Sequence, residues 1–178
     1  MGCVVEEAEP DFAGADETFR TLRFHSTFIR LSGLAKQRPG LMKETLLWEV
    51  EQGSRLTERE IQRAQAKYKE LRERMGRFLS RYEFFVLPVN QVLPFDVSDQ
   101  YPMEIEGVKL DTYIDWFKSC YYISVTATPA ISVPCGFTSE GLPVGLQIVS
   151  RAGNDWGLLQ MSRAFEAAKG LPARKCAF

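Results

Sequence analysis

Residues 129–149, PAISVPCGFTSEGLPVGLQIV, constrain the fold most, because two apolar runs there flank a Gly-Leu-Pro turn. Residues 131–133 and 144–149 are rich in β-branched and aliphatic side chains, which favours strands. The connection at 138–141 contains Thr, Ser, Glu and Gly, which are typical of a turn. The segment therefore predicts a β-hairpin, and its only acid, Glu140, lies at the tip.

Two residues of this hairpin predict local irregularities. Gly145 has no side chain, which indicates that another group approaches the strand backbone closely. Pro134 has no amide hydrogen for a ladder, so the first strand is expected to end there at a bulge or a sheet edge.

The clearest helix signal begins at Thr57. Thr57 and Glu60 form a capping box, in which each side chain bonds the other residue's amide. Apolar residues follow at spacings of three and four, with Arg, Lys and Glu opposite: Ile61, Ala64, Tyr68, Leu71, Met75 and Phe78. The pattern predicts an amphipathic helix with one core-facing stripe. A coiled coil would show the same spacing, but the pattern covers fewer than three heptads.

Four other segments predict helices. The segment after Asp16 is apolar on most sides and is expected to be largely buried. Residues 41–52 are expected to form a helix that stops at Gly53. Further helices are expected to carry Ile114, Phe117 and Tyr121, and to close the chain after residue 155. Helix caps are expected at Asp16, Asp111 and either Asn154 or Asp155.

The remaining elements are short strands and one long connection. Residues 84–88 are apolar on both faces, which is typical of an interior strand covered on both sides. Residues 3–5 predict another strand, and 103–110 a small hairpin around Glu106 and Gly107. Residues 89–102 hold two prolines and two aspartates, so we expect an irregular connection.

Alternating helices and strands predict an α/β fold: a layered mixed β-sheet flanked by helices. A chain of 178 residues fits a single domain, 1–178, with a helical segment at 41–80 and a sheet-forming core with a closing helix at 82–170. With 45% hydrophobic residues the chain can build a core. A net charge of −1 argues against nucleic acid as a partner, and no apolar run is long enough to cross a membrane.

Few residues suggest chemistry of their own. The four cysteines form no C-x-x-C pair and the chain has one histidine, so we expect no metal site and no cofactor. Unpaired thiols are typical of a reducing cytoplasm. No serine stands in a G-x-S-x-G context, and there is no glycine-rich phosphate loop. Asp96 and Asp99 are interpreted as turn formers rather than as a catalytic pair.

A family resemblance adds what the residues alone do not. YEFFVLPVNQVLPFDV at 82–97, SCYYISVTATPAISVPCGFTSEGLPVGLQIV at 119–149 and LLQMSRAFEAA behind Asp155 resemble the C-terminal third of amidase signature enzymes. The most specific strings are Pro-Ala-Ile-Ser-Val-Pro at 129–134 and Gly-Leu-Pro-Val-Gly-Leu-Gln at 141–147. The resemblance implies the C-terminal part of the amidase signature fold, and the hydrolysis of amide C–N bonds.

The sequence also departs from the family pattern. The family uses a serine nucleophile, a second serine in a cis peptide and a lysine, set in a Gly-Ser-rich signature. No such string occurs here, so no catalytic residue is carried over and the chain alone is expected to be inactive. Ser124 stands where the family usually has Asn, and Val89 where it has Thr.

The resemblance implies four substrate-contacting residues: Trp116, Tyr121, Thr126 and Ser132. For the two aromatic residues, plain core packing explains their presence equally well. The expected partners are a small amide, an N-terminal amidase portion and, because cut sheets leave open edges, further copies of the chain. Two alternatives to an amidase fragment are a non-catalytic α/β protein that binds a small molecule or partner, and a structural domain with an oligomer interface.

Overall fold

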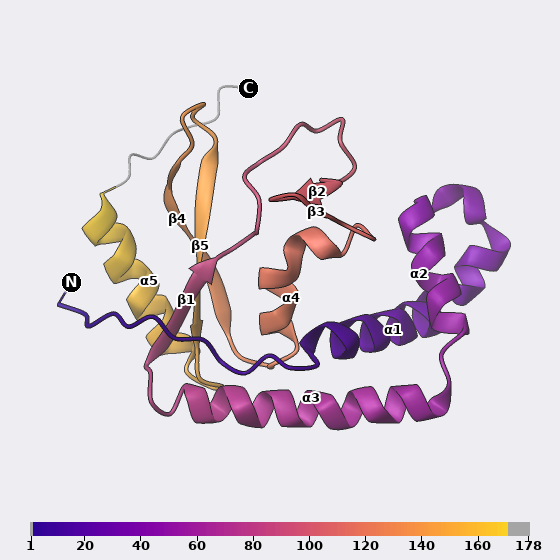
Figure 1. The fold of residues 1–178 in the computed structure, drawn as a ribbon, viewed down its shortest axis with the longest axis horizontal. Helices are drawn as coiled ribbons and strands as arrows, with labels where there is room; N and C mark the ends of the chain where they lie inside the picture. The colour runs from indigo at the N-terminus through magenta and orange to yellow at the C-terminus, as the bar shows by residue number, and fades with distance from the viewer. Residues whose placement is uncertain (1, 171–178) are drawn as a thin grey trace.

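The computed structural model describes residues 2–170 (Figure 1). The helices in this range are α1 (Ala15–Gln37), α2 (Glu44–Ser54), α3 (Glu58–Phe78), α4 (Lys118–Ser124) and α5 (Asp155–Lys169), with short 3-10 turns η1 (Pro39–Leu41) and η2 (Asp115–Phe117). The strands are β1 (Phe84–Pro88), β2 (Glu104–Ile105), β3 (Val108–Lys109), β4 (Ala130–Phe137) and β5 (Pro143–Ser150).

The main sheet has the strand order β1–β5–β4, and both pairs are antiparallel. The hairpin expected at 129–149 is therefore confirmed as β4 and β5. Its register shifts between Pro134 and Gly136, so the expected irregularity is a bulge. The first strand does not end there but runs on to Phe137, because a bulge absorbs one residue and lets the ladder resume.

The hairpin turn and the approach at Gly145 follow the sequence expectations. Gly141 has φ 85°, a left-handed conformation that glycine adopts without steric strain. A Cβ atom at Gly145 would lie 2.9 Å from both Ser132 Oγ and Val89 Cγ2. Side chains from β4 and from the residue after β1 therefore occupy the space that the missing side chain leaves.

Helix α3 begins with the expected capping box and runs beneath α1 and the sheet (Figure 1). The Thr57 hydroxyl accepts from the Glu60 amide, and Glu60 Oε2 accepts from the Thr57 amide at 2.7 Å. Its stripe of Ile61, Ala64, Leu71 and Met75 is buried. Most basic residues of α3 are exposed and stand among acids, as expected of a solvated helix surface, whereas Arg74 is largely covered and pairs with Asp11 at 2.8 Å.

Helices cover both faces of the sheet, which confirms the layered α/β fold. On one face Val149 of β5 packs with Met75 of α3, with Leu79 just after α3, and with Ile123 of α4. On the other face the neighbouring residue Ile148 packs with Val133 of β4 and Leu158 of α5. Adjacent residues of a strand point to opposite faces, so β5 ties the two layers together.

Three sequence predictions, two about strands and one about the burial of a helix, differ from the structure. β1 lies at the edge of the described sheet, paired only with β5, and is half-buried rather than interior. Residues 3–5 pair with no strand of the described chain, and Val4 and Val5 are about nine-tenths exposed. Helix α1 is only partly covered: Ile29 and Leu34 are exposed, because α2 and α3 contact other sides of the helix.

Helix boundaries also differ in places. α1 begins after Gly14 rather than Asp16, and η2 and α4 begin without a cap from Asp111. Asn154 stands at the start of α5 but makes no side-chain capping bond. Gly53 lies inside α2 instead of stopping it; a Cβ there would lie 2.2 Å from the carbonyl oxygen of Phe24. This glycine serves the packing of α2 on α1.

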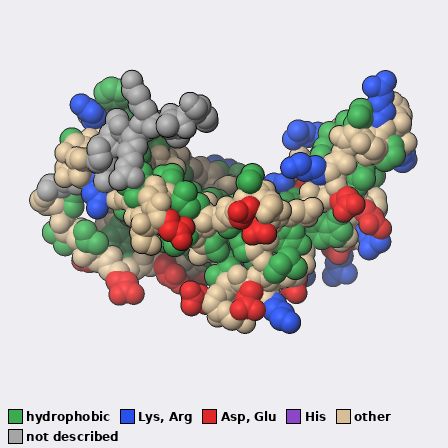
Figure 2. Space-filling model, turned by 90° about the horizontal axis from the view of Figure 1, so that it is seen from above, with side chains coloured by type: hydrophobic (Ala, Val, Ile, Leu, Met, Phe, Trp, Pro, Cys, Tyr) green, Lys and Arg blue, Asp and Glu red, His purple; other side chains and the backbone are tan. Residues whose placement is uncertain are grey.

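The segment between β1 and α4 carries much of the exposed apolar surface. Figure 2 views the molecule from the side on which this segment lies, and green hydrophobic side chains are visible across that face. The exposed large hydrophobic residues of the segment are Leu93, Phe95, Val97, Met103 and Val108. Within it, the small hairpin expected around Glu106 and Gly107 is confirmed as β2 and β3.

Candidate functional site: a cavity between α3 and the α4–β4 loop

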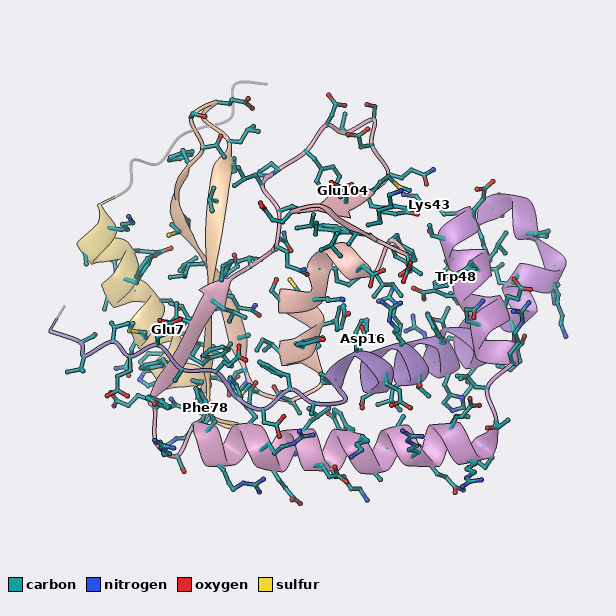
Figure 3. All side chains as sticks on the ribbon, in the orientation of Figure 1. Glu7, Asp16, Lys43, Trp48, Phe78 and Glu104 are labelled. Atoms are coloured by element: carbon teal, nitrogen blue, oxygen red, sulfur yellow. The ribbon has the colours of Figure 1, made fainter. Side chains whose placement is uncertain are left out.

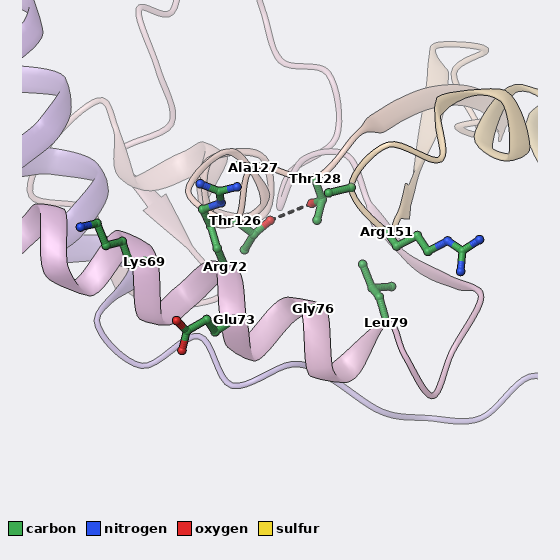
Figure 4. A pocket seen from close by; sticks show the side chains of 10 residues that line it. Lys69, Arg72, Glu73, Gly76, Leu79, Thr126, Ala127, Thr128 and Arg151 are labelled. Carbon is green, nitrogen blue, oxygen red and sulfur yellow. Dashed lines mark hydrogen bonds between the residues drawn. The ribbon is translucent and has the colours of Figure 1, made fainter.

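A cavity of about 360 Å³ lies where α3 faces the loop that joins α4 to β4 (Figure 4). Thr126, Ala127 and Thr128 form the loop side, and Arg151 closes the cavity from the end of β5. The α3 side is formed by Lys69, Arg72, Glu73, Gly76 and, just beyond the helix, Leu79. One of the four predicted substrate contacts, Thr126, therefore lines a cavity.

The loop side of the cavity is held by hydrogen bonds. The buried Thr126 hydroxyl bonds the Ile123 carbonyl at 2.6 Å, and its oxygen lies 2.8 Å from the Thr128 hydroxyl oxygen. Between them Ala127 has φ 52°, in the left-handed region. That conformation costs an alanine roughly 1–2 kcal/mol. Backbone strain of this kind is often found at functional sites.

The charge around the cavity is mainly positive. Lys69, Arg72 and Arg151 contribute three cations and Glu73 one carboxylate. None of these four side chains takes part in a salt bridge within the described residues. In Figure 4 the Arg72 guanidinium extends toward Thr126, whereas Lys69 and Arg151 extend away from the centre. The cavity thus offers hydroxyl groups and one nearby guanidinium to a polar ligand.

The other predicted contacts lie elsewhere. Trp116 is half-buried and packs edge-on against Phe95, with ring centroids 5.4 Å apart. Ser132 is exposed on the outer strand β4, with its oxygen over Gly145. Tyr121 is 1% exposed and stacks on Phe19 at 4.2 Å. Of the four residues, only Thr126 lines the cavity beside α3.

Tyr121 belongs to a polar network at the start of α1. Its hydroxyl donates to Asp16 at 2.5 Å, and Figure 3 shows Asp16 at the start of α1, close to α4. Burial and this hydrogen bond raise the pKa of Tyr121. Such a phenol stays neutral, and its contacts are those of a core residue.

Asp115 of η2 completes this network. It accepts from Arg20 Nη2 at 2.5 Å and from the Thr112 amide at 2.8 Å. Burial acts to raise the pKa of Asp115, but the Thr112 amide and the Arg20 guanidinium lower it, and the net shift is downward. Sequence reasoning missed this network because Arg20 and Asp115 are about 95 residues apart along the chain. The only signal in the sequence was that the residues are acidic, basic or hydroxyl-bearing.

Serine hydroxyls in the described chain bond mainly to backbone carbonyls, as Ser119 does to Val89 and Ser162 to Leu158. Ser98 instead donates to the Asp96 carboxylate at 2.6 Å. Hydrogen bonds from the hydroxyl and amide of Ser98 lower the pKa of Asp96, which makes it a weaker base and fits the expected turn. No serine hydroxyl is bonded to a lysine within residues 2–170, and no three metal-ligating side chains gather there.

Comparison with known proteins identifies the family. The model of the amidase family matches residues 16–159, and the chain belongs to this family. An acylamidase of Rhodococcus erythropolis is 28% identical over 172 residues, which are 95% of this chain and 36% of that protein. One subunit of the glutamyl-tRNA(Gln) amidotransferase of Myxococcus xanthus is 34% identical over 96 residues, or 54% of this chain and 18% of that protein.

Solved structures confirm the amidase signature fold. A crystal structure of an amidase superposes with a TM-score of 0.84 at 22% identity, covering 93% of this chain and 38% of that one. The structure of 6-aminohexanoate cyclic dimer hydrolase gives 0.79 at 21% identity, covering 98% and 39%. The chain thus spans well under half the length of these relatives. None of the described helices is both long and apolar enough to cross a membrane.

Proposed function

We propose that this chain is the C-terminal part of an enzyme that hydrolyses an amide C–N bond, and that it is inactive alone. The observation that carries the proposal is the coverage: 95% of the chain aligns with only 36% of the acylamidase. The hydrogen bonding of the described serines supports it, because an activated nucleophile needs an adjacent base. The chain would supply the scaffold and part of the substrate site. An N-terminal amidase portion would supply the nucleophile.

Thr126, Trp116 and Ser132 are the proposed substrate-contacting residues of this chain. Trp116 has a half-buried ring and Ser132 an exposed hydroxyl, so both retain a surface for a ligand or a further segment. Thr126 lines the cavity beside α3, where its own hydroxyl is bonded to the Ile123 carbonyl and shapes the loop. Tyr121 fits this role only through its neighbours, because its ring and hydroxyl are already occupied. The amide substrate would be small and would need no cofactor.

The test of inactivity is a hydrolysis assay on the purified chain. With benzamide and propionamide we expect no release of ammonia above background, because loss of the nucleophilic step removes several orders of magnitude of rate. A serine-directed sulfonyl fluoride provides the control. Turnover that the reagent abolishes would show a working serine in this chain and refute the proposal. An in-frame Gly-Ser-rich signature directly upstream of the Met1 codon would support it.

Association of the chain is a second part of the proposal. β1 and β4 each pair on one side only within the described sheet, and such edges invite further pairing. We expect the isolated chain to be oligomeric or prone to aggregate at micromolar concentration. Sedimentation of a monodisperse monomer would favour the alternative function instead, a free-standing α/β protein that binds a small molecule or partner. The described cysteines are free thiols, which supports a cytoplasmic location.

A further inference from the structure

A second cavity, of about 290 Å³, lies between α2 and the segment 100–113. Three aromatic residues line it: Trp48, Tyr101 and Tyr113. Two carboxylates, Glu44 and Asp111, also line it, and the remaining lining residues are two threonines and a glutamine. Sequence reasoning did not single out this group, because the two segments that form it are about 50 residues apart.

The three aromatic rings form one continuous wall. Trp48 and Tyr113 meet nearly edge to face, with centroids 6.2 Å apart, and Tyr101 lies 6.3 Å from Tyr113. Figure 3 shows Trp48 on α2, on the side that faces β2 and β3. Trp48 is held from behind by Phe24 at 5.2 Å, and Tyr113 by its hydrogen bond to Glu49. Two of the three rings are therefore fixed before a ligand arrives.

The charge of the cavity is negative. Glu44 and Asp111 are exposed at its border, and neither forms a salt bridge within the described residues. No lysine, arginine or histidine is among the described lining residues, although Arg23 Nη2 donates to the Tyr113 hydroxyl at 3.3 Å and Lys43 precedes Glu44 in the sequence. This charge is opposite to that of the cavity beside α3, where cations prevail.

We propose that this second cavity binds an organic ammonium ion. The electron-rich faces of Trp and Tyr attract a cation, and aromatic walls are a common way of recognising quaternary ammonium groups. Unpaired carboxylates at the border add long-range attraction for the same charge. The remaining lining side chains, two threonines and a glutamine, carry no charge and so do not repel a cation. The inference stands apart from amide hydrolysis, since it concerns binding alone.

The first experiment is isothermal titration calorimetry of the full chain with benzyltrimethylammonium, and with benzyl alcohol as the neutral counterpart. We expect the cation to bind with a dissociation constant on the order of 1 mM or tighter, and at least roughly tenfold more tightly than the alcohol. Raising the salt concentration should weaken binding of the cation, because the carboxylates are exposed to solvent. Equal affinity for the two compounds would overturn the proposal. So would the absence of binding when the cation is present at several times the expected dissociation constant.

Variants then locate the site. Glu44→Gln combined with Asp111→Asn should weaken cation binding by roughly tenfold, whereas Glu140→Gln combined with Glu166→Gln should change it by less than about twofold. Both double variants remove two exposed carboxylates, so equal weakening would mean that only net charge matters and would refute the assigned site. None of the four residues is buried, so the variants should fold.

The aromatic wall is tested at Tyr101, which is half-buried and lies on the connecting segment. Tyr101→Leu should weaken cation binding by roughly fivefold, and Tyr101→Phe should keep it, because the ring face carries the attraction. Thermal melts identify any loss of folding in the leucine variant. Unchanged binding in a folded Tyr101→Leu variant would remove the ring from the site and contradict the proposal.

Discussion

The helical part of the molecule (α1, α2 and residues 111–124) and its sheet part (β1, β4, β5 and α5) are stabilised in different ways. The helical part places charged groups inside and pairs them with one another. The sheet part buries aliphatic side chains on both faces, and its two outer strands each keep one edge unpaired within the described chain. One part completes its polar contacts by itself, while the other retains edges on which further chain can pair.

Glu49 shows how the helical part completes its contacts. This carboxylate of α2 is fully buried, and it accepts from Arg23 Nε at 2.6 Å, from the Thr27 hydroxyl at 2.9 Å and from the Tyr113 hydroxyl. A buried carboxylate is tolerated only when its oxygens are satisfied in this way. The three donors come from α1 and from the segment before η2, so the charge fixes three elements relative to one another.

The sheet part has no such network around its centre. Ile148 and Val149 are both fully buried, and the buried side chains packed against them are apolar and belong to β4, α5, α3 and α4. Apolar contacts are non-directional, and they hold layers together without specifying a partner at the sheet edge. The difference suggests that the helical part keeps its shape alone, whereas the sheet part depends on what pairs with its edges.

The largest effect is expected from Arg23→Met in the helical part. The variant leaves the buried Glu49 without its cation, and breaking such a pair typically removes about 3 kcal/mol of stability. Arg55→Met is the matched control, because Arg55 pairs with Glu51 of the same helix at the surface, where a pair contributes less than about 1 kcal/mol. Denaturant unfolding measures both. Similar losses would mean that Glu49 is not isolated from solvent, and the contrast between the parts would fail.

A somewhat smaller effect is expected from Gly53→Ala. The new Cβ would lie 2.2 Å from the Phe24 carbonyl oxygen, so α1 and α2 must separate, which we expect to cost about 2 kcal/mol. Gly76→Ala in α3 is the control: nothing lies within 4 Å of its Cβ, and the better helix former should add roughly 0.5–1 kcal/mol. Thermal melts should move in opposite directions. A stabilised Gly53→Ala would show that the two helices can part freely.

What the sequence predicted well was local. The capping box of Thr57, the stripe of α3 and the hairpin of β4 and β5 depend on residues a few positions apart, and all were confirmed. Gly53 was misjudged as a helix stop because its reason is a contact with α1 that no local pattern reveals. The network around Glu49 and the aromatic wall at Trp48 join distant segments, so neither was visible before the fold was known.

The family resemblance carried the functional prediction further than the residues did. It identified the amidase family correctly, and its four substrate contacts stay predictions. Thr126 lines a cavity, whereas Tyr121 turned out to be packed and hydrogen-bonded inside the helical part. An aromatic residue in a family motif gives the same sequence pattern whether its ring faces a ligand or the core. The difference is decided by tertiary packing, which the motif does not encode.

The smallest effect is expected in the sheet part, from Gly141→Val at the hairpin turn. Gly141 has φ 85°, which valine adopts only with strain, and its amide donates to the Thr138 carbonyl at 3.0 Å. The loss should be roughly 1–3 kcal/mol, toward the lower end because the exposed tip can relax. Glu140→Ala beside it should change little, since a solvated carboxylate at a turn contributes almost nothing. Thermal melts of both variants compare them directly.

Because the turn sets the register of β4 on β5, Gly141→Val should also increase aggregation of the chain. A variant that melts and sediments like the parent would show that the sheet part does not depend on this turn.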